Sequence, residues 1–155
     1  MKIGIMVCSQ TGNTLSVVEA IKEKLNSRGL EAVIEKVEPQ GEAGPGSRNI
    51  QLKSAPDVTD YDKLIFAGPV NAFSLAPAMK LYMSNLPTLE GKDVALLVTK
   101  GLKFNWTGGN KAIAQMKKYC TDRRADIAGT GIIVWSSKTL KEDIEFIASE
   151  ISEIF

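Results

Sequence analysis

Ser9-Gln10-Thr11-Gly12-Asn13-Thr14 follows the apolar run Ile3-Gly4-Ile5-Met6-Val7-Cys8 and precedes an amphipathic pattern that starts near Leu15. The apolar run predicts a buried strand, and the spacing after Leu15 predicts a helix. The first N–H groups of a helix have no main-chain acceptor, and here they lie beside hydroxyl and amide side chains. The stretch therefore predicts a strand, an anion-binding loop and a helix, in that order.

The kind of anion follows from what the loop lacks. It contains no Lys or Arg. It has neither the Gly-x-x-x-x-Gly-Lys-Ser/Thr of Walker-type sites nor the Gly-x-Gly-x-x-Gly of dinucleotide-binding folds. A neutral, hydroxyl-rich loop suits a single terminal phosphate, since hydrogen bonds to a charged group contribute about 1.5–3 kcal/mol each. An ordinary turn that leads into a capped helix is the alternative.

Length and composition predict one globular domain over residues 1–155. The chain has a mass of 16.8 kDa and is 44% hydrophobic. The apolar stretch before the loop is too short for a signal-peptide core or a membrane span, so we expect a soluble, cytoplasmic protein. A net charge of +1 gives no bulk field for nucleic acid or a membrane surface, and neither is an expected partner.

Residue usage also limits the chemistry. Histidine is absent, which excludes His-based triads, His-ligated metals and His general bases. Cys8 and Cys120 lie far apart and lack the Cys-x-x-Cys spacing of redox or zinc motifs. The sequence therefore predicts no catalytic residue and no metal site.

Apolar runs alternate with helical patterns along most of the chain. Five runs predict short buried strands: Lys2 to Cys8, Ala32 to Val37, Leu64 to Ala67, Val94 to Val98 and Ile132 to Trp135. Amphipathic spacing predicts helices after the first, third, fourth and fifth strands, the last with Thr139 and Glu142 as a capping box. This alternation predicts a doubly wound α/β domain with a five-stranded parallel sheet and helices on both faces.

The second crossover differs from the others. Between Pro39 and Thr59 the chain contains Gly41, Gly44, Pro45, Gly46 and Pro56. Glycine and proline disfavour a regular helix, so the second helix is predicted to be reduced to a loop. Ligands of doubly wound folds bind beyond the carboxyl ends of the strands, which directs attention to the loops there.

A second candidate loop follows the third predicted strand. It runs Gly68-Pro69-Val70-Asn71-Ala72-Phe73-Ser74-Leu75-Ala76-Pro77, and its glycine and prolines predict an extended path. Phe73 is able to cover an aromatic ring, and free main-chain groups around residues 70–72 are able to meet a ring edge. A place for Phe73 in the core is the alternative.

A third candidate loop runs from Thr99 to Asn110, at the end of the fourth predicted strand. Phe104 and Trp106 are costly to expose in a polar, glycine-rich loop, which favours a planar ligand stacked against them. Gly108 and Gly109 let the backbone approach a ligand closely. A loop packed by its own aromatic side chains is the alternative.

Together, these three loops resemble those of the flavodoxin-like FMN proteins, and the resemblance spans almost the whole chain. The segment from Tyr61 to Pro69 also resembles the family's third strand and its exit. The resemblance implies FMN as the cofactor, with its ribityl phosphate on the first loop and its isoalloxazine ring between the other two. The implied cofactor-binding residues are Ser9, Gln10, Thr11, Gly12, Asn13, Thr14, Pro69, Val70, Asn71, Ala72, Phe73, Ser74, Thr99, Lys100, Gly101, Leu102, Phe104, Trp106, Gly108 and Gly109.

Two functions are consistent with this resemblance. The first is an electron-transfer protein of the flavodoxin type, which passes electrons between redox partner proteins. The second is a flavin or quinone reductase that takes hydride from NAD(P)H. The small size and the lack of an inserted lid favour the carrier, either as a monomer or as a homodimer. An interaction domain that has lost its flavin is a third alternative.

The chain departs from the family in its charge. Carriers of this family are usually strongly acidic, whereas Lys100, Lys103 and Lys111 lie in or beside the third loop. We expect Lys100 and Lys103 to weaken the charge repulsion that acidic carriers exert on reduced flavin. At an effective dielectric of about 20, a unit charge about 8 Å away contributes about 2 kcal/mol before screening. A basic rim also suits an acidic partner or the phosphates of a nicotinamide nucleotide. A solvated rim is the alternative for these lysines, and it is favoured for Lys111, which lies at the predicted start of a helix.

Overall fold

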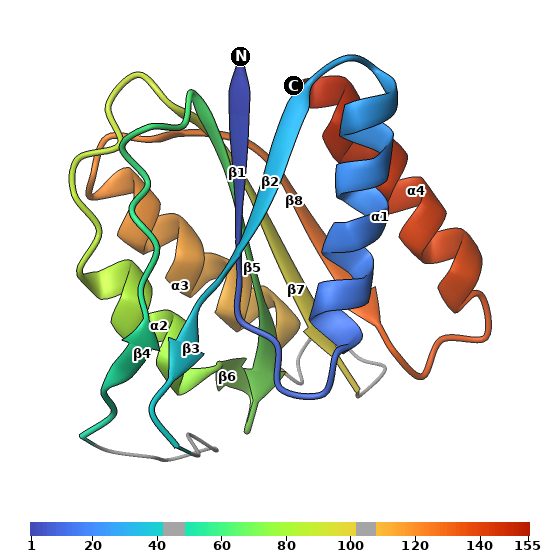
Figure 1. Cartoon of the computed structure of the whole chain (residues 1–155). Coiled ribbons are helices and arrows are strands. Elements are labelled where there is room, and N and C mark those ends of the chain that lie inside the picture. Colours follow the sequence, from blue (N-terminus) through green and yellow to red (C-terminus); the bar gives the residue numbers. More distant parts are fainter. Residues whose placement is uncertain (42–48, 102–107) are drawn as a thin grey trace.

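A parallel sheet runs through the middle of the molecule (Figure 1). The computed structural model describes residues 1–41, 49–101 and 108–155. The parallel strands are β1 (Lys2–Val7), β2 (Glu31–Lys36), β5 (Lys63–Asn71), β7 (Asp93–Lys100) and β8 (Asp126–Val134). They lie side by side in the order β2-β1-β5-β7-β8, which confirms the predicted doubly wound α/β fold.

Two helices cover each face of the sheet (Figure 1). Helices α1 (Asn13–Ser27) and α4 (Leu140–Ile154) pack together on one face, and α2 (Pro77–Ser84) and α3 (Gly109–Thr121) pack together on the other. Alternate side chains of each strand point to opposite faces, so each strand contributes to two cores. In β1, Ile5 is buried with α1 and α4, whereas Met6 is buried with α2 and α3.

The second crossover contains no helix among its described residues, as predicted. It contains instead a short antiparallel pair of β3 (Glu38–Pro39) and β4 (Leu52–Ser54). Val37 and Val58 on either side of this pair are buried in the core under α2 and α3. The crossover thus covers part of that face, where a second helix would otherwise lie.

The segment after the third parallel strand is a hairpin, which corrects the prediction of an extended loop. Strand β5 continues to Asn71 and then pairs antiparallel with β6 (Ser74–Leu75). Ala72 and Phe73 form the turn, with φ angles of 47° and 64°. Positive φ at both central residues is typical of a type I′ turn, which favours Asn and Gly. Residue preferences therefore gave no signal for this hairpin.

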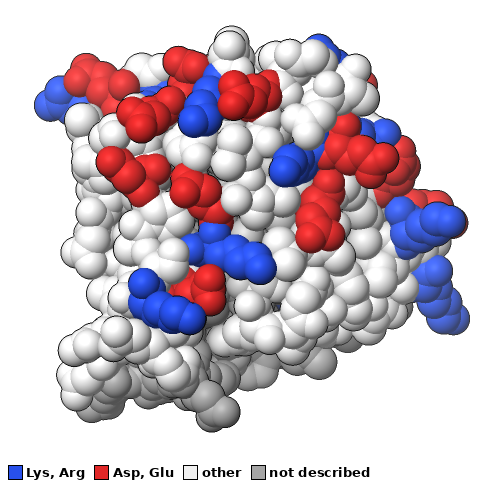
Figure 2. All heavy atoms as spheres, viewed as in Figure 1, with Lys and Arg blue, Asp and Glu red and all other residues white. Residues whose placement is uncertain are grey.

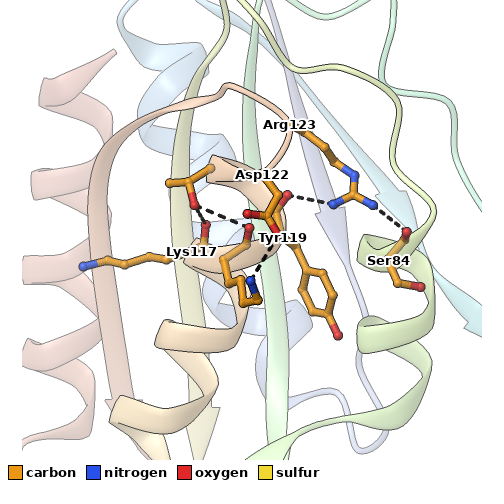
Figure 3. Close-up of polar contacts among 7 residues, drawn as sticks. Ser84, Lys117, Tyr119, Asp122 and Arg123 are labelled. Carbon is orange, nitrogen blue, oxygen red and sulfur yellow. Dashed lines mark hydrogen bonds and ion pairs between the residues drawn. The ribbon is translucent and has the colours of Figure 1, made fainter.

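Arg123 joins the carboxyl ends of α2 and α3 (Figure 3). Its guanidinium donates to the main-chain carbonyls of Ser84, Leu86 and Tyr119 at 2.5, 2.7 and 2.9 Å. Carbonyls at the C-terminal ends of helices lack N–H donors in the helix, so the guanidinium of Arg123 satisfies acceptors at the ends of two helices. No helix within the described residues is both long and apolar enough to cross a membrane.

Candidate functional site

A cavity of about 270 Å³ lies at the carboxyl ends of the parallel strands, at the lower edge of Figure 1. The strand order reverses between β1 and β5, which is where doubly wound folds bind ligands. The loop after β1, the end of β5 and the end of β7 each contribute to the wall. The lining residues are Gln10, Thr11, Asn13, Thr14, Pro69, Val70, Asn71, Thr99, Lys100, Gly101 and Trp135.

The N-terminus of α1 supplies donors beside this cavity. The first hydrogen bond within the helix is from the Ser16 N–H to the Gly12 carbonyl, and the Leu15 N–H donates to Ser9 Oγ at 3.3 Å. The N–H groups of Gly12, Asn13 and Thr14 have no acceptor among the described residues. Free N–H groups together with the positive end of the helix dipole attract an anion.

Asn71 supplies a further donor at the opposite wall. Its Nδ2 atom is buried and has no hydrogen-bond partner among the residues that the structure describes. Asn71 lines the cavity at the end of β5. A buried amide without a partner is unfavourable, and a ligand that accepts from it gains a net free energy of about 0.5–1.5 kcal/mol after its own acceptor has left water.

A hydrogen bond between side chains joins the start of α1 to the end of β7. Thr14 Oγ1 and Thr99 Oγ1 lie 2.7 Å apart, and both residues are buried. One hydroxyl donates to the other, which fixes the start of α1 against the end of β7. The walls of the cavity that these two elements form are therefore held in register.

The β5–β6 hairpin is held from outside the cavity by α3. Gln115 accepts a hydrogen bond from the Leu75 N–H at 3.0 Å, and its amide lies within hydrogen-bond distance of Ser74 Oγ. Gly108, at the start of α3, lies against the backbone of the turn, because a Cβ there would lie 2.5 Å from Phe73 Cα. These contacts hold the strained turn in place and leave the Phe73 side chain 52% exposed.

Lys100 is the charged residue among the described lining residues. It is only 4% exposed, and burial lowers the pKa of its ammonium group below the usual value. Its Cδ lies 3.2 Å from where a Cβ of Gly109 would be, which places the side chain beside the start of α3. The described lining contains no carboxylate, so the electrostatic potential of this wall favours an anionic ligand.

The structure resembles solved flavodoxins along its full length. Flavodoxin 2 from Bacillus cereus superposes with a TM-score of 0.73 at 21% identity, and all of both chains is covered. A short-chain flavodoxin associated with a non-canonical PDU bacterial microcompartment gives a TM-score of 0.72 at 14% identity, covering 99% of this chain and 95% of that one. The fold is flavodoxin-like.

One similar structure contains a ligand. A flavoprotein from Lactobacillus acidophilus in complex with FMN gives a TM-score of 0.62 at 14% identity, covering 92% of this chain and 97% of that one. Neither a protein-family model nor a curated protein sequence matches this chain. At these identities the similarity establishes the flavodoxin-like fold, and the ligand has to be argued from the site.

The flavodoxin-like fold brings half of the predicted site residues together in the lining of this cavity. Those in the first loop line the cavity except Ser9 and Gly12, which line a separate hollow of about 200 Å³ beside Lys36. Ala72 and Phe73 lie at the tip of the hairpin, and Ser74 is bonded to α3. The predicted residues Leu102, Phe104 and Trp106, and also Lys103, lie outside the described residues.

Trp135 lines the cavity but was not predicted as a site residue. It directly follows β8, and its N–H donates to the Lys100 carbonyl at 2.7 Å. Parallel strands end at the same edge of a sheet, and the sequence already predicted a strand that ends at Trp135. That rule would have placed Trp135 beside the other loops.

Proposed function

We propose that the chain is an FMN-binding electron-transfer protein of the flavodoxin type. One observation supports the proposal: Asn13 and Thr14, which have open N–H groups at the start of α1, and Asn71, which has an unpartnered amide, line the same cavity at the reversal of strand order. FMN has an acceptor group for each of these two sets of donors. It carries a terminal phosphate, which suits the helix N-terminus, and a ring whose edge accepts hydrogen bonds.

The residues present suit these roles. The N–H groups of Asn13 and Thr14, together with the side chain of Thr11, would hold the phosphate, and Asn71 would donate to the ring edge. Lys100 would lie beside the bound ligand as a buried cation. When bound, FMN supplies the redox chemistry by accepting and donating electrons, so the protein needs no acid or base of its own.

The carrier is favoured over the reductase by the size of the site. The cavity of about 270 Å³ lies just below the range of small-molecule sites, about 300–1,000 Å³. Such a volume leaves part of FMN at the surface, where a partner protein is able to exchange electrons with it. A cytoplasmic location is part of the proposal, and the free, buried Cys8 and Cys120 suit a reducing compartment.

A binding titration tests the proposal. Flavin-free protein is titrated with FMN, and the quenching of flavin fluorescence gives the Kd for wild type, Asn71→Ala and the control Asn85→Ala, which lies at the C-terminus of α2. We expect Asn71→Ala to raise the Kd about two- to tenfold, since a neutral hydrogen bond contributes about 0.5–1.5 kcal/mol. Asn71→Ala should leave the stability of the flavin-free protein unchanged or higher, because the unpartnered amide is lost. Failure of wild type to bind FMN would refute the proposal.

A second measurement separates the carrier from the reductase. Anaerobic mixing of the FMN-loaded protein with NADH or NADPH should leave the flavin absorbance unchanged over minutes. Rapid bleaching by either nucleotide without a partner protein would show hydride transfer and favour the reductase.

A further inference from the structure

We propose that the surface of α2, the β5–β6 turn and α3 docks an acidic redox protein. We define the basic face by Phe73, Lys80, Lys111 and Lys118. The inference rests on the proposed function, because the face matters as a docking site only if the cavity beside it holds a flavin.

Charge is distributed unequally between the two faces of the sheet. Helices α2 and α3 contain Lys80, Lys111, Lys117 and Lys118 and no carboxylate. On the opposite face, α4 contains five carboxylates and a single cation: Glu142, Asp143, Glu145, Glu150, Glu153 and Lys141. In Figure 2, acidic and basic side chains are interspersed over the upper half and the right of the view, and fewer charged side chains lie near the lower edge. A partner steered to the cavity edge by this field would carry negative charge.

Lys111 is placed where the helix itself disfavours a cation. It lies in the first turn of α3, close to the positive end of the helix dipole, and is exposed. A cation at this position costs about 0.3–1 kcal/mol, whereas the same charge in the last turn is favourable. Lys111 has no ion pair among the described residues, and Lys118 has an exposed one to Asp122 at 3.4 Å. Helix stability therefore does not account for Lys111, and its exposed charge is placed where an external anionic partner can reach it.

Lys80 is held in place by the hydrogen bonds that also hold the turn. Its Nζ donates to Ser74 Oγ at 3.3 Å, and Ser74 Oγ bonds to Gln115 on α3. Lys111 and Lys118 lie four residues before and three residues after Gln115, so all three lie on one side of α3. The three lysines and the turn therefore form one continuous surface rather than scattered charges.

The exposed ring of Phe73 places this surface at the cavity. Phe73 is 52% exposed at the tip of the turn, and Asn71 of the same turn lines the cavity. An exposed aromatic ring beside polar and basic residues of the neighbouring helices matches the usual anatomy of an interface, with an apolar anchor and a polar rim. A protein docked here would lie next to the cavity, which electron transfer requires.

An electron-transfer assay with a charge-switched acceptor tests the proposal. FMN-loaded protein is photoreduced and mixed with cytochrome c, either native and basic or fully succinylated and acidic. The two electrons of each reduced flavin pass singly to two haem irons, each going from Fe(III) to Fe(II), and the protons go to solvent. We expect the acidic form to react faster at low ionic strength and its advantage to vanish in high salt.

The variants separate local from overall charge. Lys111→Gln should slow reduction of the acidic cytochrome about two- to fivefold, and Lys111→Glu should slow it further. Lys141→Gln on α4 removes the same charge from the opposite face and should change the rate less than 1.5-fold. Equal effects of Lys111→Gln and Lys141→Gln would show a response to net charge alone and would overturn the proposal.

A binding measurement keeps the test independent of the flavin. The flavin-free, 15N-labelled chain is titrated with succinylated cytochrome c, and amide shifts are followed. Shifts confined to α2, the turn and α3 would support this surface as the docking site for an acidic protein. If FMN did not bind, the proposed function and the redox role of the partner would fail, and the docking surface alone would stand. Shifts on α4, or concentration-dependent shifts on the basic face without cytochrome, would overturn it, the latter because a second copy would be the occupant.

Discussion

Substitution of Gly108 tests whether the turn at the cavity is pinned by α3. A methyl group at this position would lie 2.5 Å from both Cα and the carbonyl carbon of Phe73 and 2.7 Å from its carbonyl oxygen. Ordinary contact begins near 3.4 Å, so the backbone of the turn has to move by roughly 1 Å. Gly108 also has a φ of 112°, which an L-residue rarely adopts.

Two matched substitutions separate these effects. Gly29 has a φ of 81° and open space around its Cβ position, so Gly29→Ala carries only the backbone penalty, about 1–2 kcal/mol. Gly101→Ala has open space and no positive φ, so it should cost less than about 0.5 kcal/mol. Gly108→Ala carries the backbone penalty and a clash of about 1–3 kcal/mol, or about 2–5 kcal/mol together.

Urea unfolding followed by far-UV circular dichroism measures all three values. A chain of this size loses about 2–4 °C of Tm per kcal/mol, so Gly108→Ala should melt several degrees below Gly29→Ala. If the flavin site is as proposed, Gly108→Ala should also raise the Kd for FMN, and Gly29→Ala should not. Equal stabilities of Gly108→Ala and Gly29→Ala would show that the turn yields freely, and the reasoning about a pinned turn would be wrong.

Three further predictions follow from single residues. Phe73→Gly should raise the free energy of unfolding of the flavin-free protein, measured in urea, by about 1 kcal/mol, because glycine accepts the φ of 64°. The same substitution should weaken FMN binding. Unchanged FMN binding would exclude the Phe73 ring from the site. Arg123→Ala should lower the free energy of unfolding by about 1.5–3 kcal/mol through the loss of its carbonyl partners, with the exposed Arg28→Ala as a control that changes it by less than about 0.5 kcal/mol. Burial raises the pKa of Cys8 to about 11 and that of Cys120 to about 12. At pH 8 the thiolate fraction of each is therefore lower than in the unfolded chain by roughly 100-fold or more. A disulfide reagent should label these two cysteines only after denaturation. Rapid labelling in the native state would contradict that burial.

The sequence predicted those parts of the fold that depend on long apolar patterns. The strands around Ile5, Ile65 and Leu97 read as continuous apolar runs, because both faces of a parallel sheet are buried. The start of β8 has no such continuous apolar run, because Gly129 and Gly131 stand where the other strands have larger apolar residues. A Cβ at Gly129 would lie 2.7 Å from Ile154 of α4, so close packing of the helix requires the glycines that hide the strand.

Local polar contacts were harder to predict. The capping box of Thr139 and Glu142 was wrong, because Thr139 Oγ1 donates to Asp143 Oδ1 at 3.0 Å and makes no cap hydrogen bond. Several acceptors lie within reach of one hydroxyl, and only the three-dimensional path of the chain decides between them. The open N–H groups at the start of α1 were easier to predict, since they follow from the order of strand, turn and helix alone.

In the β5–β6 turn, the residue types match the backbone conformation least well. Asn-Gly would satisfy a type I′ turn, and the chain uses glycine at other positive φ positions such as Gly12 and Gly108. Ala72 and Phe73 each cost about 1–3 kcal/mol in such a turn. Strain of this kind persists only where the surroundings over-determine it, and here Gly108 and Gln115 do so. The turn is strained, and it presents the half-exposed ring of Phe73 beside the cavity. A binding contact of this ring explains the strain better than a contribution to stability does. Phe73→Gly should separate these two explanations, because it relieves the strain and removes the ring.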